Sequence, residues 1–156
     1  MSSKPILKCA IVDDSRLQRL AIAKLIEDHS ALDLIAEWNN AIETKNGLLD
    51  TPVDLLFLDI EMPILTGFDL LDDLENKPKI IFVTGKTKYA FKAFDYDAVD
   101  YLRKPLKRDR FNAAVEKALN HLKLQHTLSY LKRFYAFLNY FLQICNLHLQ
   151  QLFHLN

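Results

Sequence analysis

The chain has little of what several classes of protein need. Among its 156 residues there are two cysteines and three glycines. Cys9 and Cys145 cannot form a disulfide framework, so a small fold held together by disulfides is excluded. Gly47, Gly67 and Gly85 stand too far apart to make a glycine-rich loop that cradles a nucleotide phosphate. The five histidines and two cysteines also lack the spacing of a metal site.

Net charge is absent as well. The 20 basic and 20 acidic residues cancel, so the overall charge gives no indication of a nucleic-acid or membrane partner. Residues 1–8 contain no apolar stretch like that of a signal peptide. We therefore expect a reducing, cytoplasmic location. Cys9 lies within an apolar strand pattern, which favours a buried and unreactive thiol.

Short apolar runs alternate with stretches of helical periodicity from residue 6 to residue 124. Strands are expected at about 6–13, 32–38, 53–59, 79–84 and 99–102. Helices are expected at about 15–29, 41–50, 66–75, 87–95 and 107–124. Ser15 with Gln18, and Thr66 with Asp69, fit the capping box that begins a helix. This alternation predicts an α/β fold, a doubly wound five-stranded parallel sheet covered by helices on both faces.

Residues 125–156 do not continue the alternation, so we predict a domain over 1–124 followed by an apolar, helical C-terminal extension. Apolar and aromatic residues recur there every three or four positions, at Leu124, Leu128, Leu131, Phe134, Leu138, Phe141, Cys145, His148, Leu152 and Leu155. Asn and Gln residues interrupt the segment too often for a good membrane span. A helix that dimerises or docks on a partner, a segment folded back on its own domain, and a disordered linker all fit this pattern.

Asp59 closes the third apolar run, which begins at Val53. Such a run is typical of a buried strand in a parallel sheet, and binding sites in these sheets gather where the strands end. Asp13 and Asp14 end the first predicted strand, which is expected beside the third. Three neighbouring carboxylates repel one another and favour a bound cation, and oxygen ligands suit Mg²⁺. The alternative is that Asp13 and Asp14 only cap the helix that starts near Ser15.

Two further strand ends carry compatible groups. Thr84 ends the fourth predicted strand and Lys104 follows the fifth. A hydroxyl, an ammonium and a bound cation are what a phosphoryl group needs from a protein, and the Asp59 carboxylate can serve as the nucleophile. Either residue alone would be unremarkable. Their occurrence at the same predicted edge as the three carboxylates indicates a phosphorylation site.

At this point the sequence resembles the receiver domain of two-component response regulators, over residues 5–124. The matching segments are Val12–Ser15, Asp59–Pro63 with Gly67, Val83–Thr84 and Lys104–Pro105. Residues 89–94 and 98–102 resemble the receivers that precede LytTR-type DNA-binding domains. The resemblance implies a flavodoxin-like fold with strand order 2-1-3-4-5.

The same resemblance implies that Asp59 is the phosphoacceptor for a sensor histidine kinase or a phosphotransfer protein. Asp14 would bind Mg²⁺ directly, Asp13 would assist, and the Glu61 backbone carbonyl would complete the protein ligands. Lys104 would pair with the phosphoryl group, and its peptide bond to Pro105 would be cis.

A switch also follows from the resemblance. Thr84 would bind the new phosphoryl oxygen and move inward, and Tyr101 would rotate into the space, changing the surface around the fifth strand. Glu61 and Lys86 lie two positions after Asp59 and Thr84, and we expect the pair to shield the acyl phosphate. A homodimer through the fifth-strand face or the C-terminal helix is a further expectation.

Two other functions fit parts of the pattern. A phosphohydrolase of the haloacid dehalogenase type also uses an aspartate nucleophile with Mg²⁺, but it has a second aspartate where this chain has Glu61. A constitutive interaction or dimerisation scaffold would act through the C-terminal helix. We do not expect an enzyme beyond self-phosphorylation and self-dephosphorylation. Direct nucleic-acid binding is not expected either, because residues 125–156 are too few for the DNA-binding domain of the related regulators.

Overall fold

The computed structural model describes residues 6–153 and the side chains of residues 6–145. Strands and helices alternate along the chain. Their bounds are β1 (Leu7–Val12), α1 (Arg16–Glu27), β2 (Leu32–Trp38), α2 (Ala41–Asp50), β3 (Leu55–Leu58), α3 (Gly67–Asp73), β4 (Lys79–Thr84), α4 (Ala90–Asp95), β5 (Asp100–Arg103) and α5 (Arg108–Phe153).

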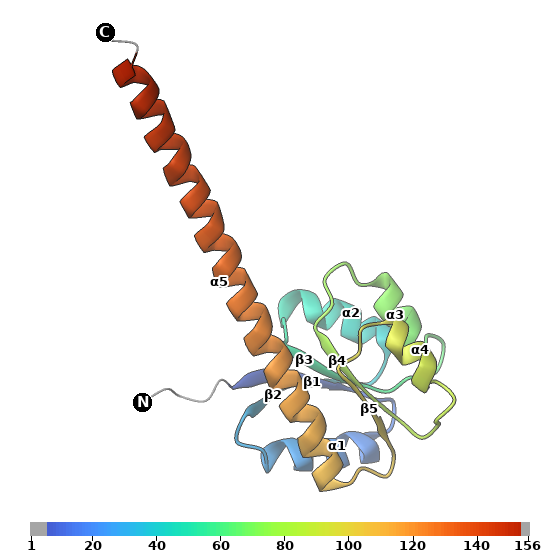
Figure 1. Ribbon diagram of the computed structural model, residues 1–156. Coiled ribbons are helices and arrows are strands. Elements are labelled where there is room, and N and C mark those ends of the chain that lie inside the picture. The colour runs from blue at the N-terminus through green and yellow to red at the C-terminus, as the bar shows by residue number, and fades with distance from the viewer. Residues whose placement is uncertain (1–5, 154–156) are drawn as a thin grey trace. The chain divides into compact units, whose positions relative to one another are not determined.

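The strands form one sheet in the order β2-β1-β3-β4-β5, and every neighbouring pair is parallel. Helix α1 and the first turns of α5 lie on one face of the sheet, whereas α2, α3 and α4 lie on the other (Figure 1). The predicted doubly wound, flavodoxin-like fold is confirmed. Because all strands run the same way, the residues that follow β1, β3, β4 and β5 meet at one edge.

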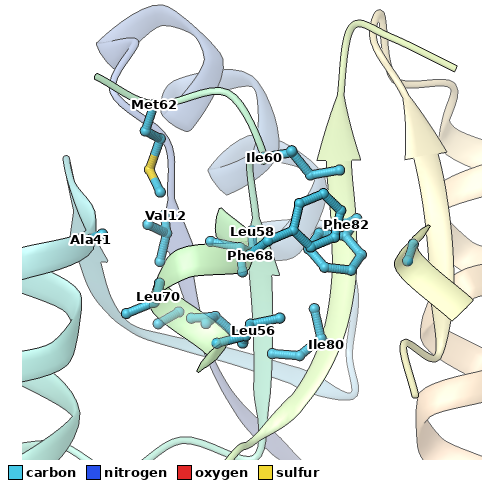
Figure 2. Packing of buried hydrophobic residues seen from close by; sticks show 13 residues of the cluster. Val12, Ala41, Leu56, Leu58, Ile60, Met62, Phe68, Leu70, Ile80 and Phe82 are labelled. Carbon is cyan, nitrogen blue, oxygen red and sulfur yellow. The ribbon is translucent and has the colours of Figure 1, made fainter. Parts of the chain in front are cut away.

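Two apolar layers hold the sheet between its helices. On one face, Phe68 of α3 packs against Phe82 of β4 with ring centroids 5.2 Å apart, within a cluster that includes Leu56 and Leu58 (Figure 2). On the other face, Phe57 of β3 stacks on Phe111 of α5, also at 5.2 Å. All four residues of β3 are buried, which agrees with the continuous apolar run that predicts a central strand.

Most predicted element boundaries are close to the observed ones, and the deviations have local causes. At Thr66 the capping box with Asp69 is confirmed. At Ser15 only half of the motif forms, with its hydroxyl accepting from the Gln18 N–H, because the Ser15 N–H donates to the Asp13 carboxylate instead. The predicted start of α4 near residue 87 is wrong. The chain first makes a turn in which the Ala90 N–H donates to the Thr87 carbonyl, and the helix begins at Ala90.

Helix α5 continues without a break to Phe153, so the helix predicted at about 107–124 and the predicted helical extension form one helix. No glycine or proline follows Pro105, so nothing in the sequence stops the helix. The chain divides into two compact units between Leu119 and Asn120. The predicted boundary after residue 124 stays a prediction. No helix among residues 6–153 is both long and apolar enough to cross a membrane.

The large apolar side chains of the second unit are exposed from Leu124 (65% exposed) to Ile144 (38%), whereas Leu122 before them is half-buried. Cys145 is half-buried. The side chains of His148, Leu152 and Leu155, which belong to the predicted apolar stripe, lie outside the described residues.

Candidate functional site

Asp59 lies directly after β3, and a backbone hydrogen bond to β1 fixes its position. Its N–H donates to the Val12 carbonyl of β1 at 2.8 Å, and its side chain is almost fully buried. The loop returns so closely that a Cβ at Gly67 would lie 2.5 Å from the Asp59 carbonyl oxygen. Gly67 is therefore required for space, and it fixes the loop that carries Asp59.

Asp13, Asp14 and Asp59 form one carboxylate cluster, as the strand order predicts. One oxygen from each lies within 4.8 Å of the others, with Asp13 and Asp59 buried and Asp14 exposed. Three converging carboxylate oxygens with one side open to water fit the coordination of Mg²⁺, which keeps several of its waters. Asp13 also accepts the Ser15 N–H at 2.9 Å, so it both starts α1 and faces the cluster.

Lys104 places its ammonium between two of these carboxylates. Its Nζ is 2.6 Å from Asp13 Oδ2 and 3.0 Å from Asp59 Oδ2. Burial alone would lower the pKa of Lys104, but the hydrogen bonds and charges of Asp13 and Asp59 outweigh it and raise the pKa. The Lys104–Pro105 peptide bond is cis, as expected.

Burial also raises the pKa of Asp59, and the negative charge of Asp13 adds to this effect. The Lys104 ammonium acts in the opposite direction by stabilising the Asp59 carboxylate. The site therefore holds two buried carboxylates with one ammonium, and a second cation would relieve their repulsion further.

Thr84 ends β4 with a fully buried hydroxyl. Within the described part of the chain its Oγ1 has no hydrogen-bond partner. A buried hydroxyl without a partner is costly and uncommon, so the group is available to a ligand oxygen. Its backbone is tied to the site, because the Lys104 N–H donates to the Thr84 carbonyl at 2.9 Å.

A second group of side chains lies beside Asp59. Glu61 pairs with Lys86 at 2.6 Å and accepts from the Tyr89 hydroxyl at 3.2 Å. The hydrogen bond from Lys86 lowers the pKa of Glu61. Tyr101 is half-buried, and its hydroxyl donates to the Lys86 carbonyl. Tyr101 therefore contacts the loop after Thr84 in this structure, rather than the carboxylate cluster.

Sequence reasoning missed Arg19. Its guanidinium donates to the Asp13 carbonyl at 2.8 Å and pairs with Glu37 of β2 at 3.3 Å. The residue thereby fixes the backbone that carries two of the three carboxylates. Its position one helical turn after Ser15 is the only signal in the sequence, and that signal does not specify a partner.

With this geometry established, comparisons with known proteins are informative. Residues 9–116 match the family model of the response regulator receiver domain. The chain is 40% identical over 114 residues to the sensory transduction protein LytR of Staphylococcus epidermidis, covering 71% of this chain and 45% of that protein. It is 35% identical over 124 residues to the transcriptional regulatory protein BtsR of Salmonella typhi, covering 78% of this chain and 50% of BtsR. The chain thus spans about half the length of these relatives.

Solved structures agree. The response regulatory domain of mrkE from Klebsiella pneumoniae superimposes with a TM-score of 0.69 at 29% identity, covering 75% of this chain and 98% of that one. The REC domain of AraT from Geobacillus stearothermophilus gives a TM-score of 0.69 at 30% identity, covering 78% and 98%. With the buried carboxylate cluster, the lysine between the carboxylates and the family match over most of the sheet, this chain belongs to the response regulator receiver family of two-component signalling.

Proposed function

We propose that Asp59 accepts a phosphoryl group from a sensor histidine kinase or a phosphotransfer protein, in a reaction that depends on Mg²⁺. The observation that carries this proposal is the position of the Lys104 ammonium, 2.6 Å from Asp13 and 3.0 Å from Asp59. An ammonium in this position can pair with an oxygen of the phosphoryl group once that group is attached to Asp59.

In the proposed reaction an oxygen of Asp59 attacks the phosphorus of a phosphohistidine. The new O–P bond forms as the P–N bond breaks, and the electron pair of that bond stays on the imidazole nitrogen. Mg²⁺, held by Asp13, Asp14, Asp59 and the Glu61 backbone carbonyl, would offset the negative charge of the phosphoryl oxygens. Lys104 would pair with one of those oxygens.

The proposed switch uses Thr84 and Tyr101. The buried Thr84 hydroxyl lacks a partner within the described residues, so a phosphoryl oxygen on Asp59 would supply one. Movement of Thr84 toward Asp59 would shift the loop that includes Lys86, whose carbonyl accepts from Tyr101. We propose that the output surface lies around β5 and α4, where Phe91 and Phe94 are 93% and 90% exposed. A homodimer through this surface is part of the same proposal.

Intact-mass measurement tests the phosphoacceptor. The protein is incubated with a small phosphodonor, with and without Mg²⁺, and compared with Asp59→Asn and with Asp33→Asn, a matched control on the exposed side of β2. One Mg²⁺-dependent phosphate adduct is expected on the natural protein and on Asp33→Asn. An adduct that survives Asp59→Asn would overturn the assignment.

A separate titration tests the cation site without phosphorylation. The single tryptophan, Trp38, accepts the Asp13 N–H through its backbone carbonyl, so its fluorescence is close enough to report on binding. Addition of Mg²⁺ should give a saturable fluorescence change, and Asp14→Asn should lower the affinity at least about tenfold, because one of the three carboxylate ligands is lost. An equal affinity in Asp14→Asn would count against this ligand set.

We also propose that the Glu61–Lys86 pair shields the acyl phosphate from water. The two side chains meet beside Asp59, whose carboxylate accepts the Glu61 N–H at 3.3 Å. Replacing both residues by alanine should speed loss of the phosphate several-fold while leaving its formation intact. A decay rate equal to that of the natural protein would contradict the shield.

Two alternative functions remain distinct from this one. A phosphohydrolase would need a free acid two residues after Asp59, whereas the Glu61 carboxylate is engaged by Lys86 and Tyr89. Sustained release of phosphate from a monoester would favour that reading. A constitutive scaffold acting through the C-terminal helix is favoured by the exposed apolar residues of that helix, and Asp59→Asn would leave its binding unchanged.

The proposal also includes the domain boundary and the location. Residues 1–124 would form the receiver domain and 125–156 an extension. The chain would catalyse only its own phosphorylation and dephosphorylation, without binding nucleic acid directly. A reducing, cytoplasmic setting is supported by Cys9, a buried free thiol whose pKa is raised by burial to about 12.

A further inference from the structure

The exposed part of α5 has a regular heptad pattern. Within the described residues, apolar or half-buried side chains lie alternately four and three positions apart. The series consists of Leu124, Leu128, Leu131, Tyr135, Leu138, Leu142 and Cys145. A repeat of seven residues with two apolar positions is the pattern by which helices pair along their length. We call these residues the heptad seam.

The two flanks of the heptad seam differ. On one flank, the positions just before Tyr135 and Leu142 are Phe134 and Phe141, which are 60% and 53% exposed. On the other flank, the positions just after Leu131 and Leu138 are Lys132 and Asn139, both exposed. One edge of the seam is therefore aromatic and the other is polar.

We propose that this chain pairs with a second copy of itself through the heptad seam, with the two helices antiparallel. In a parallel pair each flank faces the opposite flank of the second helix, so Phe134 and Phe141 would face polar residues. In an antiparallel pair like flanks meet. The phenylalanines of both copies then pack against one another, and Lys132 and Asn139 lie together at the solvent-exposed edge of the pair.

Charge favours the antiparallel over the parallel arrangement of two copies. From Asn120 to Cys145 the helix has three basic residues, Lys123, Lys132 and Arg133, and no acidic ones. In a parallel pair, each of these residues would lie at the same height along the helix axis as the identical residue of the second copy, and their positive charges would repel. An antiparallel arrangement sets Lys132 level with residues near Phe141 of the second copy, so the like charges are separated.

The register follows from the seam. We align the two antiparallel helices so that the middles of residues 120–153 coincide. Tyr135 of one copy then lies against Leu138 of the other. The same symmetry pairs Leu131 with Leu142 and Leu128 with Cys145. In this register Phe134 lies beside Phe141 of the second copy. Every described seam position from Leu128 to Cys145 then has a seam partner.

The area that the pair would bury comes from aromatic side chains and leucines together. Aromatic side chains bury roughly 150–250 Å² each. Phe134, Tyr135 and Phe141 are 60%, 63% and 53% exposed, so these side chains of two copies would contribute up to roughly 500–900 Å². Stable interfaces bury about 1,200–2,000 Å² in total, so the aromatic side chains supply about half of that area. The exposed leucines of the seam, Leu128, Leu131, Leu138 and Leu142, add to it.

The first test is the mass of the full-length protein in solution, by sedimentation equilibrium. We expect an assembly of two chains. Leu131→Glu/Leu138→Glu places two charges in the seam and should weaken association by roughly 100-fold or more. The matched control, Ser129→Glu/Ala136→Glu, adds the same two charges seven residues apart on the opposite side of the helix and should leave the mass unchanged. A natural protein that is monomeric up to high micromolar concentration, or a control that dissociates as fully as the seam variant, would overturn the proposal.

The second test reads the orientation, using the chain's own cysteines under a mild oxidant. Cys9 is fully buried, so Cys145 is the reactive thiol of the natural protein. An antiparallel pair keeps the two Cys145 thiols apart, so the natural protein should not crosslink. Leu128→Cys should crosslink to Cys145 of the second copy, and adding Cys145→Ser should abolish the link. A disulfide dimer of the natural protein would overturn the antiparallel assignment.

Phosphorylation separates this inference from the proposed function. The seam variants should accept a phosphoryl group in the same yield as the natural protein, because Asp59 lies in the other unit. Conversely, Asp59→Asn should keep the mass of two chains. A seam variant that dissociates and still forms the adduct shows that its receiver unit is folded.

Discussion

The two units of this chain use apolar residues in opposite ways. In the first, β3 buries all four of its residues and places charged groups at the edge where it ends. In the second, every large apolar side chain from Leu124 to Ile144 is exposed, and the sequence from Asn120 onward has no acidic residue. Their apolar composition alone does not separate them, because both are rich in leucine and phenylalanine. Spacing does: continuous runs make buried strands, whereas a repeat of three and four makes a surface that needs another helix.

The largest difference in stability between the two units is expected when one phenylalanine of each is replaced by alanine. Phe57 is fully buried and stacks on Phe111, whereas Phe137 is 65% exposed. Phe57→Ala should lower the free energy of unfolding by about 3–5 kcal/mol, because it leaves a cavity between sheet and helix. Phe137→Ala should change it by less than about 0.5 kcal/mol. Urea denaturation followed by far-UV circular dichroism measures both, and equal losses would contradict the contrast between the units.

Two lysines separate the units by function. Lys104→Ala removes the ammonium between Asp13 and Asp59 and should slow phosphate adduct formation about 100-fold, the usual cost of losing a preorganised charge. Lys132→Ala in the second unit should leave the rate unchanged. The measurement is the initial rate of adduct formation by intact mass. An unaltered rate in Lys104→Ala would remove this residue from the site.

Two glycines of the first unit form the next comparison. A Cβ at Gly67 would meet the Asp59 carbonyl oxygen at 2.5 Å, whereas a Cβ at Gly85 has open space around it. Gly67→Ala should cost about 1–3 kcal/mol because the backbone has to move. Gly85→Ala should be neutral or stabilise by about 0.4–1 kcal/mol through the unfolded chain. Thermal unfolding distinguishes them, and a neutral Gly67→Ala would mean that the loop at Asp59 yields easily.

The smallest expected effect depends on pH. Burial alone would raise the pKa of Asp100, but hydrogen bonds from Arg110, Lys117 and the Tyr101 N–H outweigh it and lower the pKa to about 2. A lowered folded-state pKa gives stability that is present above the unfolded pKa of about 4 and is lost as the pH falls toward 2.

Asp100→Asn should therefore lose about 1 kcal/mol at pH 7, after allowance for screening around its two exposed partners. The difference between the two proteins should shrink as the pH is lowered from 5 to 3. Denaturation at several pH values checks this, with Asp33→Asn as the control. A difference that does not change with pH would show that the Asp100 carboxylate contributes through packing and not through charge.

The sheet and the main site residues were predictable because they depend on regular geometry. In a parallel sheet, Asp13, Asp59 and Lys104 must reach the same edge once the strand order is known, and the sequence pattern was strong enough to place each strand end. The side-chain contacts of Arg19 and Tyr89 were not predictable. Arg19 reaches the Asp13 carbonyl and Tyr89 reaches Glu61 across loops, so these bonds depend on rotamers that no spacing rule encodes.

The extension shows the same division. A helical, apolar segment was expected, and the helix itself is confirmed to Phe153. The predicted stripe, however, took Phe134 and Phe141 as members, whereas the strict alternation of three and four runs through Tyr135 and Leu142 beside them. The choice between these two series depends on the helix being continuous, because a break in the helix would change which residues lie on the same side of it.

The central claim is that Asp59 is the phosphoacceptor of a Mg²⁺-dependent receiver. The most direct measurement is the intact mass of the natural protein and of Asp59→Asn after incubation with a small phosphodonor and Mg²⁺. The account predicts one phosphate adduct on the natural protein, none when Mg²⁺ is removed, and none on Asp59→Asn. An adduct of equal yield on Asp59→Asn, or one that forms equally well without Mg²⁺, would contradict it.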